Sequence, residues 1–155
     1  MEQEENRAGG AASAMNISER LADVYVRKAE ADEGRRGEYY EKAVSKFEFL
    51  YENGYSTRQM MENIGILYEQ TGDFNKAEEI LTEMVEKYPD NYIGYKRLAY
   101  LEADKQQNKE NEERDYQQMK EYYDMAKELY GGNADDQEMQ MLDNLMQDLK
   151  NENWL

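Results

Sequence analysis

The chain has 155 residues, and its 35 Asp and Glu side chains against 19 Lys and Arg give it a formal net charge of −16. A length of this size is typical of a single domain. The negative charge argues against nucleic acids and anionic membrane surfaces as partners, because both are bound mainly through basic side chains. It favours a protein or peptide partner that is neutral or carries a basic segment.

The residue types that the chain lacks restrict its chemistry. It has no Cys and no His, which removes disulfides, thiol nucleophiles, zinc–thiolate sites and the commonest general base. Its serines therefore have no histidine to activate them, and it has neither a phosphate-binding glycine loop nor the spacing of a calcium loop. We expect no enzymatic activity, no cofactor and no metal site. A single Pro and many Glu, Lys and Met residues predict an all-α protein.

The first 54 residues are predicted to contain a segment without apolar periodicity and two helices. Residues 1–15 are polar and then rich in Gly and Ala, without apolar periodicity, so we predict a disordered arm or a linker. A helix is expected over about 16–30 and a second over about 38–52, which Gly54 follows as a typical residue after a helix end. The charged stretch 29–37 between them is predicted to be a loop or extra helical turns.

The most regular stretch is 55–91, YSTRQMMENIGILYEQTGDFNKAEEILTEMVEKYPDN. Ser56 is predicted to begin a helix, with Gln59 in the capping-box position. A turn at Gly72 separates this helix from a second one, which Pro89 ends because proline cannot continue the hydrogen-bond ladder. Apolar residues fall at helical spacing in both helices: Met60, Met61, Ile64, Leu67, Tyr68, Phe74, Ala77, Ile80, Leu81, Met84, Val85 and Tyr88.

This stretch resembles a tetratricopeptide repeat (TPR), a pair of antiparallel helices with a 34-residue period. The residues that carry the resemblance are Met61, Ile64, Gly65, Tyr68, Gly72, Asp73, Phe74, Ala77, Leu81, Met84 and Pro89. Met61 and Met84 depart from the pattern, which has Trp and a small residue there. Leu98 lies 34 residues after Ile64, as direct stacking of repeats requires. The resemblance implies an α-α superhelix, a TPR solenoid of three helix pairs and a C-terminal capping helix.

The resemblance predicts one TPR-like domain, in which the first and the third repeat are irregular. The predicted segments are the domain 16–155, its repeats at about 17–54, 55–91 and 92–130, and its capping helix at about 135–150. A charged insertion, 105–115, separates the helices of the third repeat. The final helix is expected to begin at Asp135, with Glu138 in the capping-box position. Its apolar stripe either covers the end of the array, with Trp154 packed against the third repeat, or docks onto a separate partner.

In TPR arrays the first helices line a concave groove that binds peptides. The resemblance assigns this role to Arg20, Asp23, Arg27, Gln59, Glu62, Asn63, Ile66, Ile93, Lys96, Arg97 and Tyr100. The amide of Asn63 either holds a peptide backbone, since it can donate and accept at once, or faces solvent. Asp23 stands where carboxylate-binding TPR proteins have Asn, and it would repel such a ligand, so we expect no binding of C-terminal carboxylates.

The sequence therefore predicts a non-enzymatic interaction module that binds a peptide or protein segment in the groove. The alternative is a regulatory or oligomerisation tail of a larger bacterial signalling protein such as a Ser/Thr kinase. No apolar run is long enough to span a bilayer and the N-terminus has no signal-peptide core. We accordingly expect a cytoplasmic location, with the chain a monomer or a weak homodimer.

Overall fold

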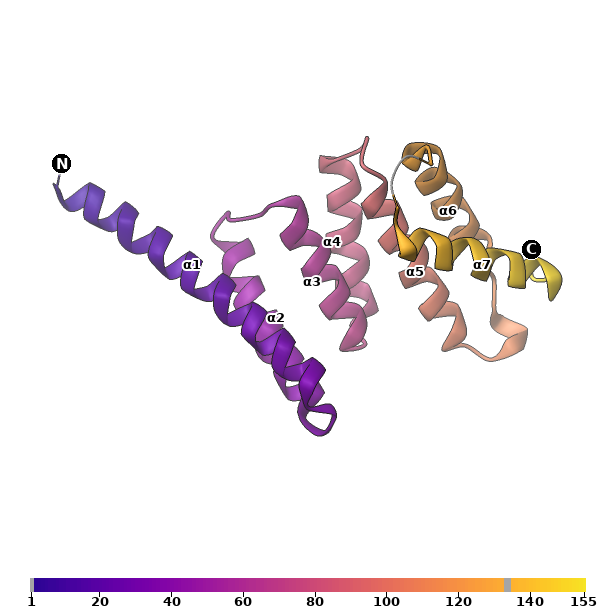
Figure 1. Ribbon diagram of the computed structural model, residues 1–155, viewed down its shortest axis with the longest axis horizontal. Coiled ribbons are helices and arrows are strands. Elements are labelled where there is room, and N and C mark those ends of the chain that lie inside the picture. Colours follow the sequence, from indigo (N-terminus) through magenta and orange to yellow (C-terminus); the bar gives the residue numbers. More distant parts are fainter. Residues whose placement is uncertain (1, 133–134) are drawn as a thin grey trace. The chain divides into compact units, whose positions relative to one another are not determined.

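The computed structural model describes the backbone of residues 2–132 and 135–155 and the side chains of residues 14–132 and 135–155. Within these ranges the chain forms seven α-helices and two short 3-10 segments, without a β-strand (Figure 1). The all-α prediction is thereby confirmed, whereas stacking into a superhelix stays a prediction. The chain consists of two compact units, Met1–Asp73 (unit 1) and Phe74–Leu155 (unit 2).

Unit 1 holds three α-helices. They are α1 (Glu2–Ala31), α2 (Arg36–Glu52) and α3 (Arg58–Gln70), and the 3-10 segment η1 (Glu33–Arg35) joins the first two. Helices α1 and α2 lie side by side, and the N-terminal part of α1 extends past the end of α2 (Figure 1). The long N-terminal helix and the short connection make this hairpin the main framework of unit 1.

The hairpin is held together by small and aromatic side chains. Ala22 and Ala29 of α1 and Ala43 of α2 are fully buried, which lets the two backbones approach closely. The rings of Tyr25 and Tyr39 stack with their centroids 6.4 Å apart, a geometry that adds to the hydrophobic stabilisation. Further along the chain, the hydroxyl of Tyr68 in α3 donates to Glu48 of α2 over 2.7 Å.

Unit 2 contains α4 (Phe74–Lys87), α5 (Tyr92–Gln107), η2 (Asn111–Glu113), α6 (Gln117–Tyr130) and α7 (Gln137–Asn151). One apolar cluster joins α5, α6 and α7. Its buried members are Ala99, Ala103, Tyr116, Met119, Ala126, Met139, Leu142, Met146 and Leu149. The apolar stripe predicted for the last helix is therefore buried within its own unit.

Trp154 packs against unit 2 as expected. Its ring meets that of Tyr116 edge to face, with centroids 5.5 Å apart. Tyr116 immediately precedes α6 and is 3% exposed. The C-terminal residues thus fold back onto the start of α6, since an edge-to-face aromatic pair adds stabilisation beyond the area that it buries.

Glycine and proline end the helices where the sequence predicted. The predicted Gly54 and Gly72 have positive φ angles of 78° and 82°, and Gly131, which follows α6, has one of 63°; this conformation costs glycine little. Helix α4 ends at Lys87, two residues before Pro89. These ends follow from local chemistry, and for that reason they could be read from the sequence.

Other helix starts differ from the prediction. Helix α1 begins at Glu2, so residues 2–15, predicted to be an arm or linker, are helical; their Glu and Ala content favours a helix despite two glycines. The start of α3 is capped by Thr57, whose hydroxyl accepts from the Met60 amide, rather than by Ser56. The start of α7 is capped by Asp136 rather than Asp135.

The two predicted insertions are partly helical. Of 29–37, the first residues extend α1 to Ala31, and η1 follows before α2 begins at Arg36. Of 105–115, the first residues extend α5 to Gln107, and η2 lies within the remainder. Both stretches therefore add helical turns as well as loop.

Helices α4 and α5 cross closely at Gly94. A Cβ atom on this buried glycine would lie 2.5 Å from Cγ1 of Val85, closer than packed atoms tolerate. Val85 has little freedom to move away, because a β-branched side chain in a helix is held in one rotamer. Gly94 therefore sets the spacing of the helix pair at the start of unit 2.

Candidate functional site

The predicted groove residues of unit 1 meet at a pocket of about 320 Å³. It lies among α1, α2 and α3, and we call it the α1–α3 pocket. Its lining residues are Asp23, Val26, Glu30, Phe47, Asn63, Ile66 and Leu67. Three of them, Asp23, Asn63 and Ile66, are candidates from the sequence, so the structure brings together residues from two predicted repeats.

The pocket has an apolar floor and an acidic rim. Phe47 and Leu67 are 2% and 3% exposed, which places them at its base, while Val26 and Ile66 are half-buried. Asp23 and Glu30 are exposed, and neither has an ion pair among the described residues. A ligand with an apolar group and a cation would therefore satisfy both parts of the pocket.

Asn63 is partly engaged within α3. Its side-chain oxygen accepts a hydrogen bond from Gln59 Nε2 over 3.2 Å, and the same nitrogen donates to Glu62 over 3.2 Å. The Nδ2 of Asn63 has no hydrogen-bond partner among the described side chains. The amide is thus oriented by Gln59 with its two N–H donors available for a backbone carbonyl.

The remaining candidates of unit 1 lie outside the pocket lining. Arg20 and Arg27 are exposed on α1, whereas Glu62 of α3 is buried. Gln59 acts on the pocket only through its bond to Asn63. Sequence reasoning left out Glu30, although its position seven residues after Asp23 places both on one face of α1.

A second set of candidates, in unit 2, is already bound by the chain itself. We call it the α5–α7 network, and its members are Tyr92, Lys96, Arg97, Tyr100, Asp136 and Glu138. Lys96 has a side chain only 4% exposed, and its Nζ lies 3.0 Å from Asp136 Oδ2 and 3.1 Å from Glu138 Oε1. The Tyr92 hydroxyl donates to the same Asp136 oxygen over 2.7 Å.

Arg97 and Tyr100 complete the network on the other side of Glu138. The Arg97 guanidinium binds both carboxylate oxygens of Glu138, with 2.8 Å between Nη2 and Oε1. The Tyr100 hydroxyl donates to the Glu138 backbone carbonyl over 2.6 Å. A bidentate pair of this kind is both strong and geometrically specific. Lys96, Arg97 and Tyr100, predicted to face an open groove, instead hold the first turn of α7.

Both carboxylates of the network are held in their charged form. Burial opposes ionisation of Asp136, but the hydrogen bonds from Tyr92 and Lys96 outweigh it and lower its pKa to about 2. Burial also opposes ionisation of Glu138, and its bonds to Arg97 and Lys96 lower its pKa below the ordinary value. Glu138 therefore pairs with α5 instead of completing the capping box predicted for it.

Ile93, the last candidate, is half-buried at the start of α5. It lies two residues after the cap residue Asn91, whose side-chain oxygen accepts from the Ile93 amide over 2.9 Å. Ile93 belongs neither to the α1–α3 pocket nor to the α5–α7 network. The sequence candidates thus lie in two separate units, and only some of them belong to the pocket or to the network.

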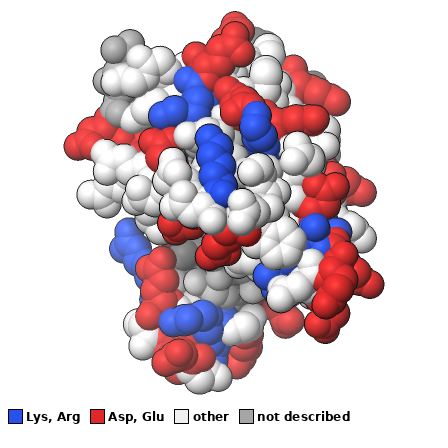
Figure 2. All heavy atoms as spheres, turned by 90° about the vertical axis from the view of Figure 1, so that its right-hand side faces the viewer, with Lys and Arg blue, Asp and Glu red and all other residues white. Residues whose placement is uncertain are grey.

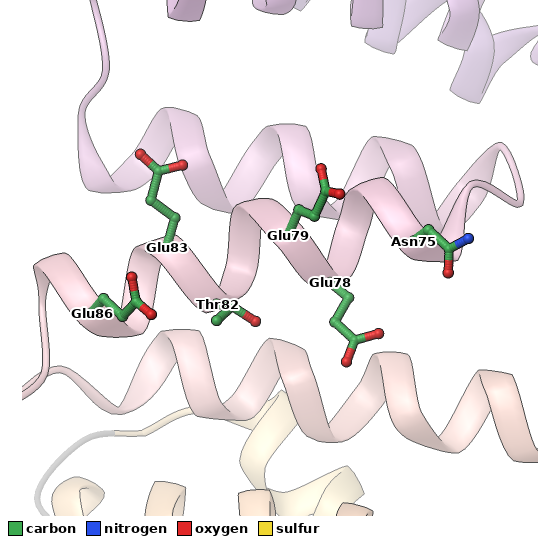
Figure 3. A pocket seen from close by; sticks show the side chains of 6 residues that line it. All are labelled: Asn75, Glu78, Glu79, Thr82, Glu83 and Glu86. Carbon is green, nitrogen blue, oxygen red and sulfur yellow. The ribbon is translucent and has the colours of Figure 1, made fainter.

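A third surface, along α4, is acidic and open. A hollow of about 710 Å³ is lined by Asn75, Glu78, Glu79, Thr82, Glu83 and Glu86, and Figure 3 shows these side chains along α4. Glu78 points toward α5 (Figure 3), where Lys105 Nζ lies 2.9 Å from it. Among the described residues no group of carboxylates is arranged to hold a metal ion. We interpret this strip as a solvated helix face, in keeping with the acidic side chains spread over the surface in Figure 2.

Comparison with known proteins adds no family. Neither the family models nor the curated protein sequences contain a match to this chain. None of the described helices has the length and apolar character needed to cross a bilayer.

Proposed function

We propose that the chain is a non-enzymatic interaction module that binds a segment of another protein in the α1–α3 pocket. The observation that carries this proposal is the pocket's lining: an apolar floor, two acidic side chains without ion pairs and an oriented amide. Such a combination suits an extended peptide better than a small metabolite, because it offers few convergent polar groups for a compact ligand.

The chemistry of the lining defines the partner. Asp23 and Glu30 attract a Lys or Arg side chain, and Val26 and Ile66 offer apolar contact beside them. Asn63 donates to a carbonyl of the peptide backbone, whatever the side chains are. The partner segment therefore contains a basic residue close to an apolar one. The TPR resemblance of 55–91 agrees with this proposal, since the pocket residues of α3 belong to that stretch.

Fluorescence polarisation with a panel of labelled peptides tests the proposal. Each peptide places a Lys or Arg within three residues of a Leu, and a matched peptide carries Glu in place of the basic residue. We expect the basic peptides to bind and Ile66→Asp to weaken them at least about tenfold, because it puts a charge onto the apolar part of the pocket. Asn63→Ala should weaken them less, by about the free energy of one hydrogen bond.

Two variants serve as matched controls. Ile17→Asp makes the same change at a residue of α1 that is 58% exposed, and Asn75→Ala removes an exposed amide from α4. Both should leave peptide affinity unchanged. Binding of the basic peptides that ignored Ile66→Asp and Asn63→Ala, or a complete lack of binding across the panel, would contradict the proposal.

A further inference from the structure

The first turn of α7 brings its carboxylates to a prepared set of donors on α5. Tyr92, Lys96 and Tyr100 follow one another at intervals of four residues and therefore lie on one face of the helix. Lys96 donates to Asp136 and Glu138, while the two tyrosines donate to Asp136 and to the Glu138 carbonyl. This face of α5 is built to bind a short segment with two closely spaced carboxylates.

Most of the packing that holds α7 in place lies beyond these polar contacts, and Tyr92 and Tyr100 take part in both, since they also pack against the apolar cluster of unit 2. Further along α7, Met139, Leu142, Met146 and Leu149 are 5% exposed or less and belong to the apolar cluster of unit 2. The network involves only Asp136, before the helix, and Glu138 in its first turn. Since apolar burial is the main stabilising contribution, α7 can stay packed when its first turn releases α5.

Part of the network is open to solvent. The Glu138 side chain is 43% exposed, although its oxygens bind both Lys96 and Arg97. The Arg97 side chain itself is 14% exposed, so an outside carboxylate reaches it as the Glu138 carboxylate moves into solvent. Arg97 is suited to such an exchange, because its planar guanidinium binds two oxygens at once whichever chain supplies them.

We propose that Asp136 and Glu138 are an internal ligand that occupies a second binding site, formed by Lys96, Arg97, Tyr92 and Tyr100, for an acidic segment of a partner protein. The contact is autoinhibitory: the partner binds when its carboxylates replace those of α7. This site shares no residue with the α1–α3 pocket, lies in the other unit and binds a partner of opposite charge. The proposal is therefore independent of the function proposed above.

An external acidic segment needs a high affinity to displace Asp136 and Glu138, because these residues belong to the same chain as the site. A tethered segment competes at an effective concentration in the millimolar range or above. The net charge of −16 also repels an acidic segment at long range, an effect that salt at about 0.15 M largely screens beyond roughly 8 Å. The wild-type chain should accordingly bind acidic segments weakly, and removal of the two carboxylates should expose the site.

The test uses the full chain and the double variant Asp136→Ser/Glu138→Gln. Serine keeps the helix cap that Asp136 supplies, because its hydroxyl also accepts from the first backbone amides, and glutamine keeps the shape of Glu138. The probe is a labelled peptide of alternating Asp and Ser, with Asn in place of Asp as its control. Fluorescence polarisation at physiological ionic strength measures both peptides against both proteins.

We expect the double variant to bind the acidic probe at least about tenfold more tightly than the wild type, since the tethered competitor is gone. Adding Arg97→Gln should cancel the gain. The matched control Asp148→Ser/Glu152→Gln changes the net charge equally at exposed positions and should give no gain. Equal binding by the wild type and the double variant, or an equal gain in the control, would overturn the proposal.

Trp154 fluorescence shows whether the variant stays folded. Its ring packs on Tyr116, outside the network, so its emission should match that of the wild type. The single variant Glu138→Gln, which keeps Asp136 on Lys96, should show a smaller gain with the same emission. A shift of the double variant's emission toward that of the unfolded chain would count against the proposal, because the carboxylates would then hold the fold rather than occupy a site.

Discussion

The α1–α3 pocket of unit 1 and the α5–α7 network of unit 2 differ in what fills them. In the pocket, Asp23 and Glu30 have no ion-pair partner among the described residues. In the network, Asp136 and Glu138 are paired with Lys96 and Arg97. Polar helix faces that look equivalent in the sequence can thus serve either an external partner or the chain's own next helix.

The network is filled, and the pocket is open, because within the described part of the chain only unit 2 has a following helix whose side chains complement the site. After α5 and α6, helix α7 supplies both an apolar stripe and two carboxylates, and these meet the apolar and basic parts of the same neighbourhood. In unit 1, none of the described side chains offers Asp23 or Glu30 a cation within ion-pair distance. Substitutions in the open pocket should therefore weaken the binding of a partner, whereas removal of the two carboxylates from the filled network should strengthen it.

Loss of apolar packing on α7 should change stability the most. Leu142 is fully buried in unit 2, whereas its neighbour Met141 is 61% exposed. Leu142→Ala should lower the free energy of unfolding by about 2–5 kcal/mol, through lost burial and the cavity left behind. Met141→Ala should change it by less than about 0.5 kcal/mol. Urea unfolding monitored by circular dichroism measures both.

If Leu142→Ala and Met141→Ala destabilised the chain equally, α7 would not be packed as described. The double variant Asp136→Ser/Glu138→Gln provides a reference on the same helix. Its cost should be smaller than that of Leu142→Ala, since its apolar contacts are intact and the introduced hydroxyl and amide oxygens can still accept hydrogen bonds from the buried Lys96. A larger cost would make the network, rather than the apolar stripe, the main attachment of α7.

A smaller effect is expected at the close crossing of α4 and α5. Gly94→Ala should destabilise the chain by roughly 1 kcal/mol, the overpacking against Val85 exceeding the gain in helix propensity. The second change Val85→Ala should relieve the clash, so the double variant should lose less than the sum of the two single ones. Thermal unfolding of the three variants gives this coupling.

Gly37→Ala is the matched control for Gly94→Ala. No atom lies within 4 Å of a Cβ at Gly37, which is in the first turn of α2. Alanine there should stabilise the chain by about 0.4–1 kcal/mol, because it restricts the unfolded chain. Destabilisation by both substitutions would show that the spacing at Gly94 is not the cause.

The parts of the fold that the sequence revealed have local causes. Gly54, Gly72 and Pro89 end helices through their own backbone properties, so no distant residue was needed to place those ends. Choices between adjacent residues were missed: Thr57 rather than Ser56 and Asp136 rather than Asp135 cap their helices. All four are good cap residues, and tertiary packing decides which one stands at the helix start.

The site was predictable only in part, for a different reason. Asp23, Asn63 and Ile66 were found because the repeat pattern places each on the outward face of its helix. The pairing of Lys96 with Asp136 joins residues 40 apart in sequence, and no local pattern shows which acid will meet which base. The sequence therefore did not show that the α1–α3 pocket is open while the α5–α7 network is filled.

The network should also make the stability of the chain depend on pH. The pKa of Asp136 is lowered from 3.8 to about 2, so its pairing stabilises the fold above about pH 4 and this contribution is lost as the pH falls toward 2. The stability difference between the wild type and Asp136→Ser/Glu138→Gln should therefore shrink over that range. Urea midpoints at several pH values measure it; a constant difference would mean that the carboxylates do not interact with their charged partners.

Two probe peptides measured against two proteins distinguish the open pocket from the filled network in a single experiment. The basic, apolar peptide should bind the wild type and Asp136→Ser/Glu138→Gln with equal affinity, because the α1–α3 pocket is unchanged. The acidic peptide should bind the double variant at least about tenfold more tightly than the wild type, because only there is the α5–α7 site free of its internal competitor. If both peptides gained affinity equally in the double variant, or neither distinguished the two proteins, the distinction between one open and one self-occupied site would be contradicted.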